Sequence, residues 1–328
     1  MRIFDFQFIW LFLPSLAIAH PASNEKHEEH WSANIDVLYW KASEEGLDYA
    51  VQVSSNAQFQ PKSMHWEHPS FEWSPGFRLG FTDLQIKKPW ALSLIWTHFC
   101  SESKSHSSGG SSHRFLEQLW VPSPFGIDAR RASVKWKLNY NTLDCLLLHP
   151  YKMSQYFCFT PGFGLRGLFI DQHFTAKYSG GDFSSNHPIR LKAENDYNAL
   201  GLHLDLGLQF DWNRHWGLFA KGTGTLLYGK FHVPERVSGE NVLIQVSSRH
   251  LFKEHRNFWA VTNDLGAALG IHFKTFQRKS SVDISFAYEI IKTFNQNQLR
   301  RYRDQNPENP QNTDLGLEGV TLAFDFNW

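Results

Sequence analysis

The chain is a succession of segments in which apolar and polar residues alternate one by one. The clearest segment runs from Leu200 to Trp212, where Leu, Phe and Trp alternate with Gly, His, Asp and Gln. Successive side chains of a strand point to opposite faces, so this period of two predicts a strand with one apolar face. The pattern recurs at 31–41, 71–83, 89–99, 131–148, 155–171, 215–231, 257–275, 280–294 and 315–328.

In the segment 131–148 the alternation slips near Thr142, which predicts a β-bulge there. The connections between segments also alternate in length. Short links occur at 84–88, 149–154, 213–214 and 276–279, and long ones at 42–70, 100–130, 172–195, 232–256 and 295–314. Barrels of bacterial outer membranes have short periplasmic turns and longer extracellular loops.

These features predict an all-β fold: a transmembrane up-and-down antiparallel β-barrel of about ten strands over residues 31–328. An even number of strands places both termini on the periplasmic side. A twelve-strand barrel is the alternative, and it requires a hairpin inside a long loop. Residues 51–59 with 64–66, or residues 242–252, could supply that hairpin.

The last strand ends the chain on an aromatic residue. Val320, Leu322, Phe324, Phe326 and Trp328 share one face. Lipid offers no hydrogen-bond partner to a free strand edge, so a membrane sheet must close. We therefore expect these five side chains to face lipid and the strand to pair with residues 31–41. This C-terminal strand is also the segment expected to engage the barrel-assembly machinery.

The amino terminus predicts export. Arg2 precedes an apolar stretch from Phe8 to Ala19, and Ala17-Ile18-Ala19 fits a signal-peptidase site. A membrane-anchoring helix is the alternative, but the stretch is short for a span of ~20 residues. We expect residues 1–19 to be a cleaved signal peptide and residues 20–30 a short periplasmic tail.

Composition agrees with a barrel that contacts lipid. Aromatic residues make up 16% of the chain, including 28 Phe and 13 Trp, while the mean hydropathy is −0.40. A barrel can direct its aromatic rings at lipid and its polar residues at the lumen. The chain has 32 basic and 32 acidic residues, and this balanced net charge does not suggest a nucleic-acid partner. Outer-membrane lipid is therefore the expected partner.

Charged residues on the predicted polar faces are the candidates for a functional lumen. They could form salt bridges that fill a narrow barrel, or they could line a solute path. Ten strands lie near the small end of barrel sizes, which favours a narrow or plugged lumen over a wide pore. The candidates are Asp36, Arg78, Lys135, Lys137, Arg166, His203, Asp205, Asp211, Asp264, Asp283, Glu289 and Asp325.

The three cysteines leave two interpretations open. Cys145 and Cys158 flank the turn at 149–154 and could form a disulfide in an exported protein, although two free thiols are the simpler expectation. Cys100 is left over and could link neighbouring molecules. The 17 His are scattered without ligand spacing, so we expect no metal site and no cofactor.

Several short motifs resemble a known family. They include Val37-Leu38-Tyr39-Trp40-Lys41 and, most specifically, Pro161-Gly162-Phe163-Gly164-Leu165-Arg166-Gly167-Leu168-Phe169-Ile170-Asp171-Gln172. The combination resembles the Legionella-type major outer membrane protein family, which is also found in chlamydia-related bacteria. The resemblance implies an abundant, porin-like barrel of the bacterial outer membrane without agreed catalytic residues.

The leading functional hypothesis is a porin-like envelope protein that passes small solutes or has a structural or surface role. The alternative is a surface adhesin or host-contact protein that binds through its long loops. A hydrolase would need an acid–histidine cluster at the loop-side rim. His98 and Asp264 are candidates, but no motif joins them, and we expect no enzyme.

Overall fold

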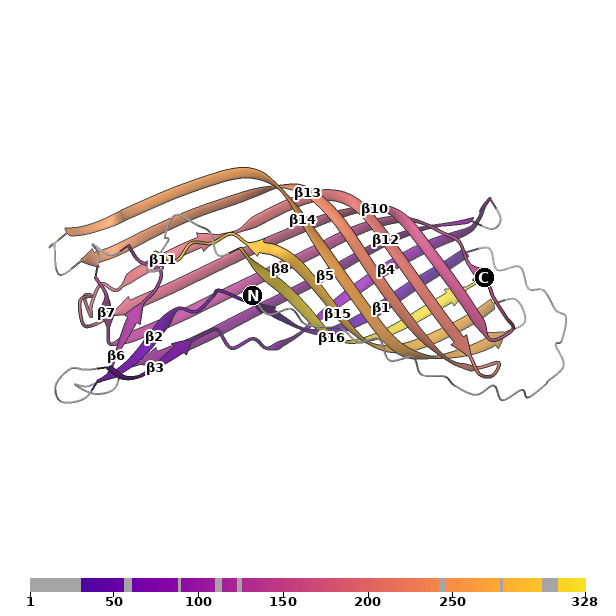
Figure 1. Cartoon of the computed structure of the whole chain (residues 1–328), viewed down its shortest axis with the longest axis horizontal. Coiled ribbons are helices and arrows are strands. Elements are labelled where there is room, and N and C mark those ends of the chain that lie inside the picture. Colours follow the sequence, from indigo (N-terminus) through magenta and orange to yellow (C-terminus); the bar gives the residue numbers. More distant parts are fainter. Residues whose placement is uncertain are drawn as a thin grey trace, which may run out of the picture.

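The computed structural model describes residues 31–55, 61–87, 90–109, 114–122, 126–241, 246–277, 280–302 and 312–328. Across these residues, ten long antiparallel strands form a sheet that closes on itself (Figure 1). The wall strands are β1 (Trp31–Glu44), β4 (Trp73–Lys87), β5 (Trp90–Ser108), β8 (Arg131–Leu148), β10 (Phe157–Ser179), β12 (Asp196–Asp211), β13 (Trp216–Asn241), β14 (Val246–Gln277), β15 (Ser280–Asn297) and β16 (Thr313–Asn327).

The barrel closes where the sequence predicted. β16 pairs with β1, and Val320 lies opposite Tyr39 in the register. Trp31 and Trp328 exchange two backbone hydrogen bonds of 3.0 Å at the end of this seam. The predicted ten-strand barrel is therefore confirmed. The predicted signal peptide (residues 1–19) and tail (residues 20–30) lie outside the described residues.

The two ends of the barrel differ. At one end, the turn end, short connections join the strands, and the C-terminus lies there (Figure 1). At the other, the loop end, further strands are β2 (Ala50–Ser55), β3 (Pro61–Glu67), β6 (Arg114–Gln118), β7 (Asp128–Ala129) and β11 (Ile189–Glu194). A short β9 (Tyr151–Lys152) pairs with β10 near the turn end.

Neither proposed hairpin adds two strands to the barrel. β2 and β3 do pair, but they belong to a separate four-stranded sheet with β6 and β7. Residues 246–252 extend β14 along β13 beyond the barrel. β11 bridges β10 and β13 above the end of β12. The long connections thus carry ordered β-structure, which sequence alternation alone did not resolve.

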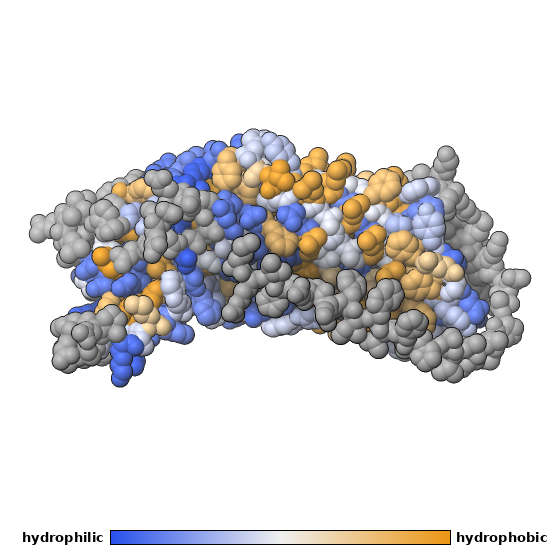
Figure 2. All heavy atoms as spheres, viewed as in Figure 1, coloured by the Kyte–Doolittle hydropathy of each residue, from blue (hydrophilic) through white to orange (hydrophobic). Residues whose placement is uncertain are grey.

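The outer face of the wall toward the turn end is an apolar belt. On the face shown in Figure 2, apolar residues gather over this part of the barrel. Tyr39 stacks on Trp73 at 5.6 Å and Tyr228 on Trp259 at 5.3 Å, at the upper edge of the belt. The belt from Trp31 to Tyr39 measures about 21 Å at ~3.4 Å per residue and ~40° tilt, close to the ~25 Å expected for a membrane barrel.

No helix among the described residues is long and apolar enough to cross a membrane.

Toward the loop end, the apolar side chains change to the inner face of the wall. On β8, Leu143 is 47% exposed on the outer face, whereas Trp136 and Leu138 are buried inside. The register of β8 with β5 and β10 continues through Thr142 without a break. The predicted bulge is therefore wrong: the backbone keeps its alternation, and the apolar residues switch sides.

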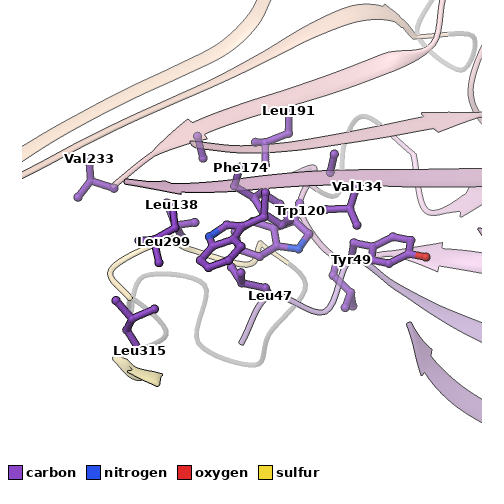
Figure 3. Close-up of a cluster of buried hydrophobic side chains, with 14 of the residues drawn as sticks. Leu47, Tyr49, Trp120, Val134, Leu138, Phe174, Leu191, Val233, Leu299 and Leu315 are labelled. Atoms are coloured by element: carbon purple, nitrogen blue, oxygen red, sulfur yellow. The ribbon is translucent and has the colours of Figure 1, made fainter. Parts of the chain in front are cut away.

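This switch creates a buried apolar core inside the loop end of the barrel (Figure 3). Inward side chains of the wall, such as Phe174 and Leu138, meet residues from the connections, such as Leu47, Trp120 and Leu299. The Trp120 and Phe174 rings lie 4.4 Å apart. We call these packed residues the apolar plug, since they fill the barrel interior as a soluble protein fills its core.

Candidate functional site

A layer of charged side chains crosses the lumen below the apolar plug. Its centre is Arg166, projecting inward from β10 and almost fully buried. Its guanidinium donates to both carboxylate oxygens of Asp144 at 2.6 and 2.8 Å and to Asp264 at 3.0 Å. Buried charges of this kind persist only when they are paired and hydrogen-bonded. These contacts link β8, β10 and β14 across the lumen.

A second cation extends the layer on the other side. Arg78 on β4 donates to Asp36 at 3.0 Å and to Glu289 at 2.9 and 3.1 Å. Its guanidinium lies 5.5 Å from the centre of the Trp40 ring, which belongs to the apolar plug. Trp40 donates from Nε1 to Thr321 Oγ1 at 3.2 Å. Trp40 therefore marks the boundary between the ion-paired layer and the plug.

His203 also belongs to this layer, and its hydrogen bonds indicate a neutral imidazole ring. Its Nε2 lies 3.3 Å from Arg166 Nη2, a donor, and its Nδ1 lies 2.7 Å from Thr225 Oγ1. The guanidinium can only donate, so Nε2 accepts and Nδ1 carries the proton. A space of about 70 Å³ lies between the charged groups, enough for a few water molecules.

Closer to the turn end, two smaller ion-paired groups line the same inner face. Lys221 contacts Asp205 at 2.7 Å. His272 lies 2.8 Å from Asp211 and 3.2 Å from Asp283. Asp325 is paired in register with Asp283 and so shares its inner face.

Most of the predicted lumen residues thus lie inside, but two do not. Lys135 and Lys137 lie on the outer face of β8, because the adjacent Trp136 and Leu138 turn into the plug. Their predicted lumen position is wrong. The alternation predicts that the apolar residues beside them face lipid, but at that height the apolar environment is inside the barrel.

Sequence reasoning also missed Asp144 and Lys221 as members of the lumen set. Asp144 lies between Leu143 and Cys145, which both face outward. That local alternation was the signal for an inward Asp144, and the assumed bulge at Thr142 obscured it.

The proposed disulfide between Cys145 and Cys158 is absent: all three cysteines are free. Cys145 lies opposite Leu165 in the register, and Cys158 opposite Gln209. Residues 145 and 158 are therefore offset by seven residues along β10, or about 23 Å. Cys100 lies on the outer face of β5, with Sγ 3.4 Å from His98 Nε2.

The double variant Cys145→Ser/Cys158→Ser is expected to unfold at the same urea concentration as the parent protein, with and without reductant. A native disulfide would instead stabilise the parent by ~2–4 kcal/mol in its oxidised form. Urea titration of the refolded proteins, followed by gel mobility of the unheated sample, measures this. A reductant-sensitive difference between the two would contradict the assignment of free thiols.

A layer of uncharged polar groups lies in the plug near the loop end. Gln172, Asn195 and Gln296 are fully buried there, and Gln172 Nε2 donates to Glu44 at 2.5 Å and to Gln296 at 3.0 Å. Glu44 lies five residues beyond Tyr39, outside the lipid belt. Burial raises the pKa of Glu44 well above its ordinary value.

The free energy of unfolding of Glu44→Gln is to be compared with that of the parent protein at two pH values. The difference is expected to favour the variant more at pH 8 than at pH 4. A carboxyl whose pKa is raised on folding costs stability progressively as the pH rises from the pKa of the unfolded chain to the raised value, and the full cost is present above it. The cost vanishes below the pKa of the unfolded chain, near 4.3. The measurement is the urea midpoint of both proteins across this pH range. A Gln variant that loses stability at high pH would contradict a raised pKa.

The candidate hydrolase pair is not assembled. His98 lies on the outer face of β5 with Nδ1 2.7 Å from Asn141 Oδ1, whereas Asp264 lies inside against Arg166. Among the described ranges, no group of three or more His, Cys, Asp or Glu is arranged to hold a metal ion.

The closed ten-strand wall, its apolar outer belt and its ion-paired interior define a transmembrane β-barrel of the outer-membrane type. The sequence matches the family described as Legionella pneumophila major outer membrane protein precursor over residues 24–328. The chain belongs to this family and is a bacterial outer-membrane protein. The resemblance found in the sequence is therefore confirmed.

Similarity to solved structures is distant. The outer membrane protease OmpT from Escherichia coli has 9% identity and a TM-score of 0.42, with 92% of this chain and 98% of that chain covered. The attachment invasion locus protein Ail of Yersinia pestis has 9% identity and a TM-score of 0.24, covering 91% and 99%.

A Pseudomonas aeruginosa FadL homologue has 8% identity and a TM-score of 0.26, covering 91% and 90% of the two chains. Likenesses this weak support no statement about function. No protein of curated function matches the sequence.

Proposed function

We propose that this protein is a closed envelope barrel with a structural and surface role, rather than a diffusion pore. Its loop end faces outward from the cell and its turn end faces the periplasm. The orientation rests on the usual arrangement of short periplasmic turns and long outer loops. The leading hypothesis from the sequence allowed either this role or passive passage of small solutes.

The apolar plug is the observation that supports a closed lumen. Trp40, Phe99, Trp136 and Phe174 project inward from four wall strands, and each is at most 1% exposed. The Trp40 and Phe99 rings are 5.7 Å apart. A porin lumen carries water, whereas side chains packed to this degree leave no aqueous path between them.

The connections complete the closure. Trp120 enters the barrel between β6 and β7 and donates from Nε1 to the Asp48 carbonyl oxygen at 2.7 Å. Tyr178 on β10 donates to the Tyr49 carbonyl oxygen at 2.6 Å. Asn297 Nδ2 donates to the Glu45 carbonyl oxygen at 2.9 Å. These contacts fasten the connection before β2 and the connection after β6 to one another and to the wall strands β10 and β15, so the plug is part of the folded barrel.

Planar-bilayer recording tests this proposal. The protein refolded from urea is expected to give no reproducible conductance steps under conditions in which a general porin prepared in the same way conducts. Retention of the fold is checked in the same sample by gel mobility of the unheated protein. Regular ohmic steps from the correctly folded protein would overturn the closed lumen.

An adhesive surface role is the second candidate, and one feature favours it. On β3, an edge strand of the small sheet at the loop end, Met64 is 61% exposed and Trp66 49% exposed. Arg301 lies 5.8 Å from the centre of the Trp66 ring. Exposed apolar side chains outside the lipid belt, next to a cation, suit contact with another macromolecule.

Met64→Ser/Trp66→Ser separates the two roles. Loss of binding of labelled protein to host cells, with unchanged stability, would favour adhesion. Unchanged binding would leave the structural role as the proposal. Met153→Ser at the turn end, where Met153 is also exposed, is the matched control.

A further inference from the structure

The outer wall above the lipid belt carries a row of basic residues that is separate from the ion-paired layer of the lumen. Directly paired positions on six adjacent strands form this row, and five of the six are basic. They are Lys104 on β5, Lys135 on β8, Thr175 on β10, Lys192 on β11, Arg236 on β13 and Lys253 on β14. We call the five basic residues the basic row.

The basic row faces outward along its whole length. The residues that flank its members in sequence, such as Trp136, Leu191 and Glu235, are buried inside the barrel. Next to the row, Lys177 lies directly opposite Arg190. A groove of about 520 Å³ runs across this surface, lined by Lys104, Lys135, Thr175, Lys177, Arg190 and Lys192.

Such an arrangement is unfavourable for the isolated protein. Like charges directly opposite one another on neighbouring strands repel and destabilise the sheet. Glu102 relieves part of this repulsion through contacts with Lys104 at 2.5 Å and Lys135 at 3.0 Å. These lysines lower the pKa of Glu102 to about 2, so it remains ionised. Among the described residues, Glu102 is the carboxylate whose contacts with the row are seen, and it does not balance five cations; an external anion would.

The height of the basic row limits what that anion can be. Lys104, Arg236 and Lys253 lie six to eight residues beyond the last lipid-facing rings of their strands, which are Trp96, Tyr228 and Trp259. With ~3.4 Å per residue and ~40° tilt, this is about 15–20 Å above the belt. Phospholipid headgroups extend only ~5–8 Å beyond the hydrocarbon. Among membrane lipids, one with a longer anionic head is needed to reach the row.

We propose that the basic row binds the phosphorylated sugar head of the outer-leaflet glycolipid, lipopolysaccharide. The assignment rests on the proposed orientation, which places the loop end at the outer leaflet. The wall below the row is the lipid-facing belt itself, so the molecule beside it has its acyl chains against that belt. Lysine and arginine on one surface then meet the phosphate and carboxylate groups of the same lipid.

Calorimetric titration of the refolded protein in zwitterionic detergent with rough lipopolysaccharide tests this. Wild type is expected to bind saturably. Its affinity is expected to fall steeply as salt is raised from about 0.05 to about 0.5 M, because salt screens the attraction between the basic row and the anionic head. Lys192→Gln/Arg236→Gln is expected to bind about 30-fold more weakly, from the usual contribution of a basic residue near an anionic lipid surface.

The matched control is Lys62→Gln/Lys152→Gln, which removes the same charge from exposed positions outside the row. It is expected to bind like wild type. All substituted side chains are exposed, and gel mobility of unheated samples verifies the fold. Equal weakening in both double variants, or none in the first, would overturn the basic row as the site.

Two further titrations distinguish other anions. Phosphatidylglycerol micelles are expected to bind more weakly than lipopolysaccharide, because their heads do not reach the row. Equal binding would refute the extended-head requirement. A soluble sulfated oligosaccharide that binds more tightly than lipopolysaccharide would replace the glycolipid with a soluble glycan. Conductance is unaffected by any of these outcomes, so the closed lumen is judged separately.

Discussion

Arg166→Met is expected to lower the free energy of unfolding by ~3–5 kcal/mol, because it leaves two buried carboxylates without a counter-ion. Asp144 and Asp264 both contact Arg166 in the lumen, and both are at most 4% exposed. The measurement is a urea titration of protein refolded in lipid vesicles.

A triple variant makes this result specific. Arg166→Met with Asp144→Asn and Asp264→Asn removes the buried charges together and is expected to regain most of the lost stability, since replacing a whole buried ion group is often close to neutral. The control is Lys292→Met, which breaks an exposed pair with Asp314 at the loop end and should cost at most ~1 kcal/mol. If Arg166→Met lowered the free energy of unfolding no more than Lys292→Met does, Arg166 would not be the counter-ion of a buried ion-paired layer.

Trp40→Ala is expected to lower the free energy of unfolding by ~3–5 kcal/mol, which is the range for removing a large side chain from a packed core. Trp40 is 1% exposed and contacts Phe99, Arg78 and Thr321. Trp40→Phe keeps most of the volume and loses the hydrogen bond to Thr321, so a loss of about 1 kcal/mol is expected. The same urea titration measures both.

The adjacent residue provides the control. Tyr39 is 51% exposed on the opposite face of β1, where its ring stacks on Trp73. Tyr39→Ala should cost about 1 kcal/mol, since it loses an aromatic pair at the edge of the belt but leaves no cavity. If Tyr39→Ala proved as costly as Trp40→Ala, the inner face of β1 would not be a packed core.

The sequence was sufficient to predict the barrel, its number of wall strands and its closing seam. Alternation identifies a strand and divides its residues into two faces, but it does not say which face meets which environment. On β8 the face of Trp136 and Leu138 was assigned to lipid, and Lys135 and Lys137 to the lumen. Lipid and the plug are both apolar. The apolar face of a strand therefore points outward within the belt and inward at the height of the plug, although the alternation is the same.

The sequence could predict most of the charged residues that face the lumen, but not which of them contact one another. Arg166, Asp264 and His203 were recognised as inward candidates, yet they come from three strands far apart in the sequence. Only the register of the closed sheet brings them to one level. The basic row was hidden for the same reason: five cations on five strands align only when the strand staggers are known.

The change of face near Thr142 has a mechanical consequence for how the protein sits in its membrane. Moving the barrel inward by a few residues would carry Lys137 toward hydrocarbon, where an outward lysine costs up to ~2–4 kcal/mol at the midplane. Moving it outward would expose Leu143 and its neighbours to water. The same switch occurs on β1, between Tyr39 outside and Trp40 inside. Side-chain chemistry on separate strands therefore sets the depth at which the barrel sits in the membrane.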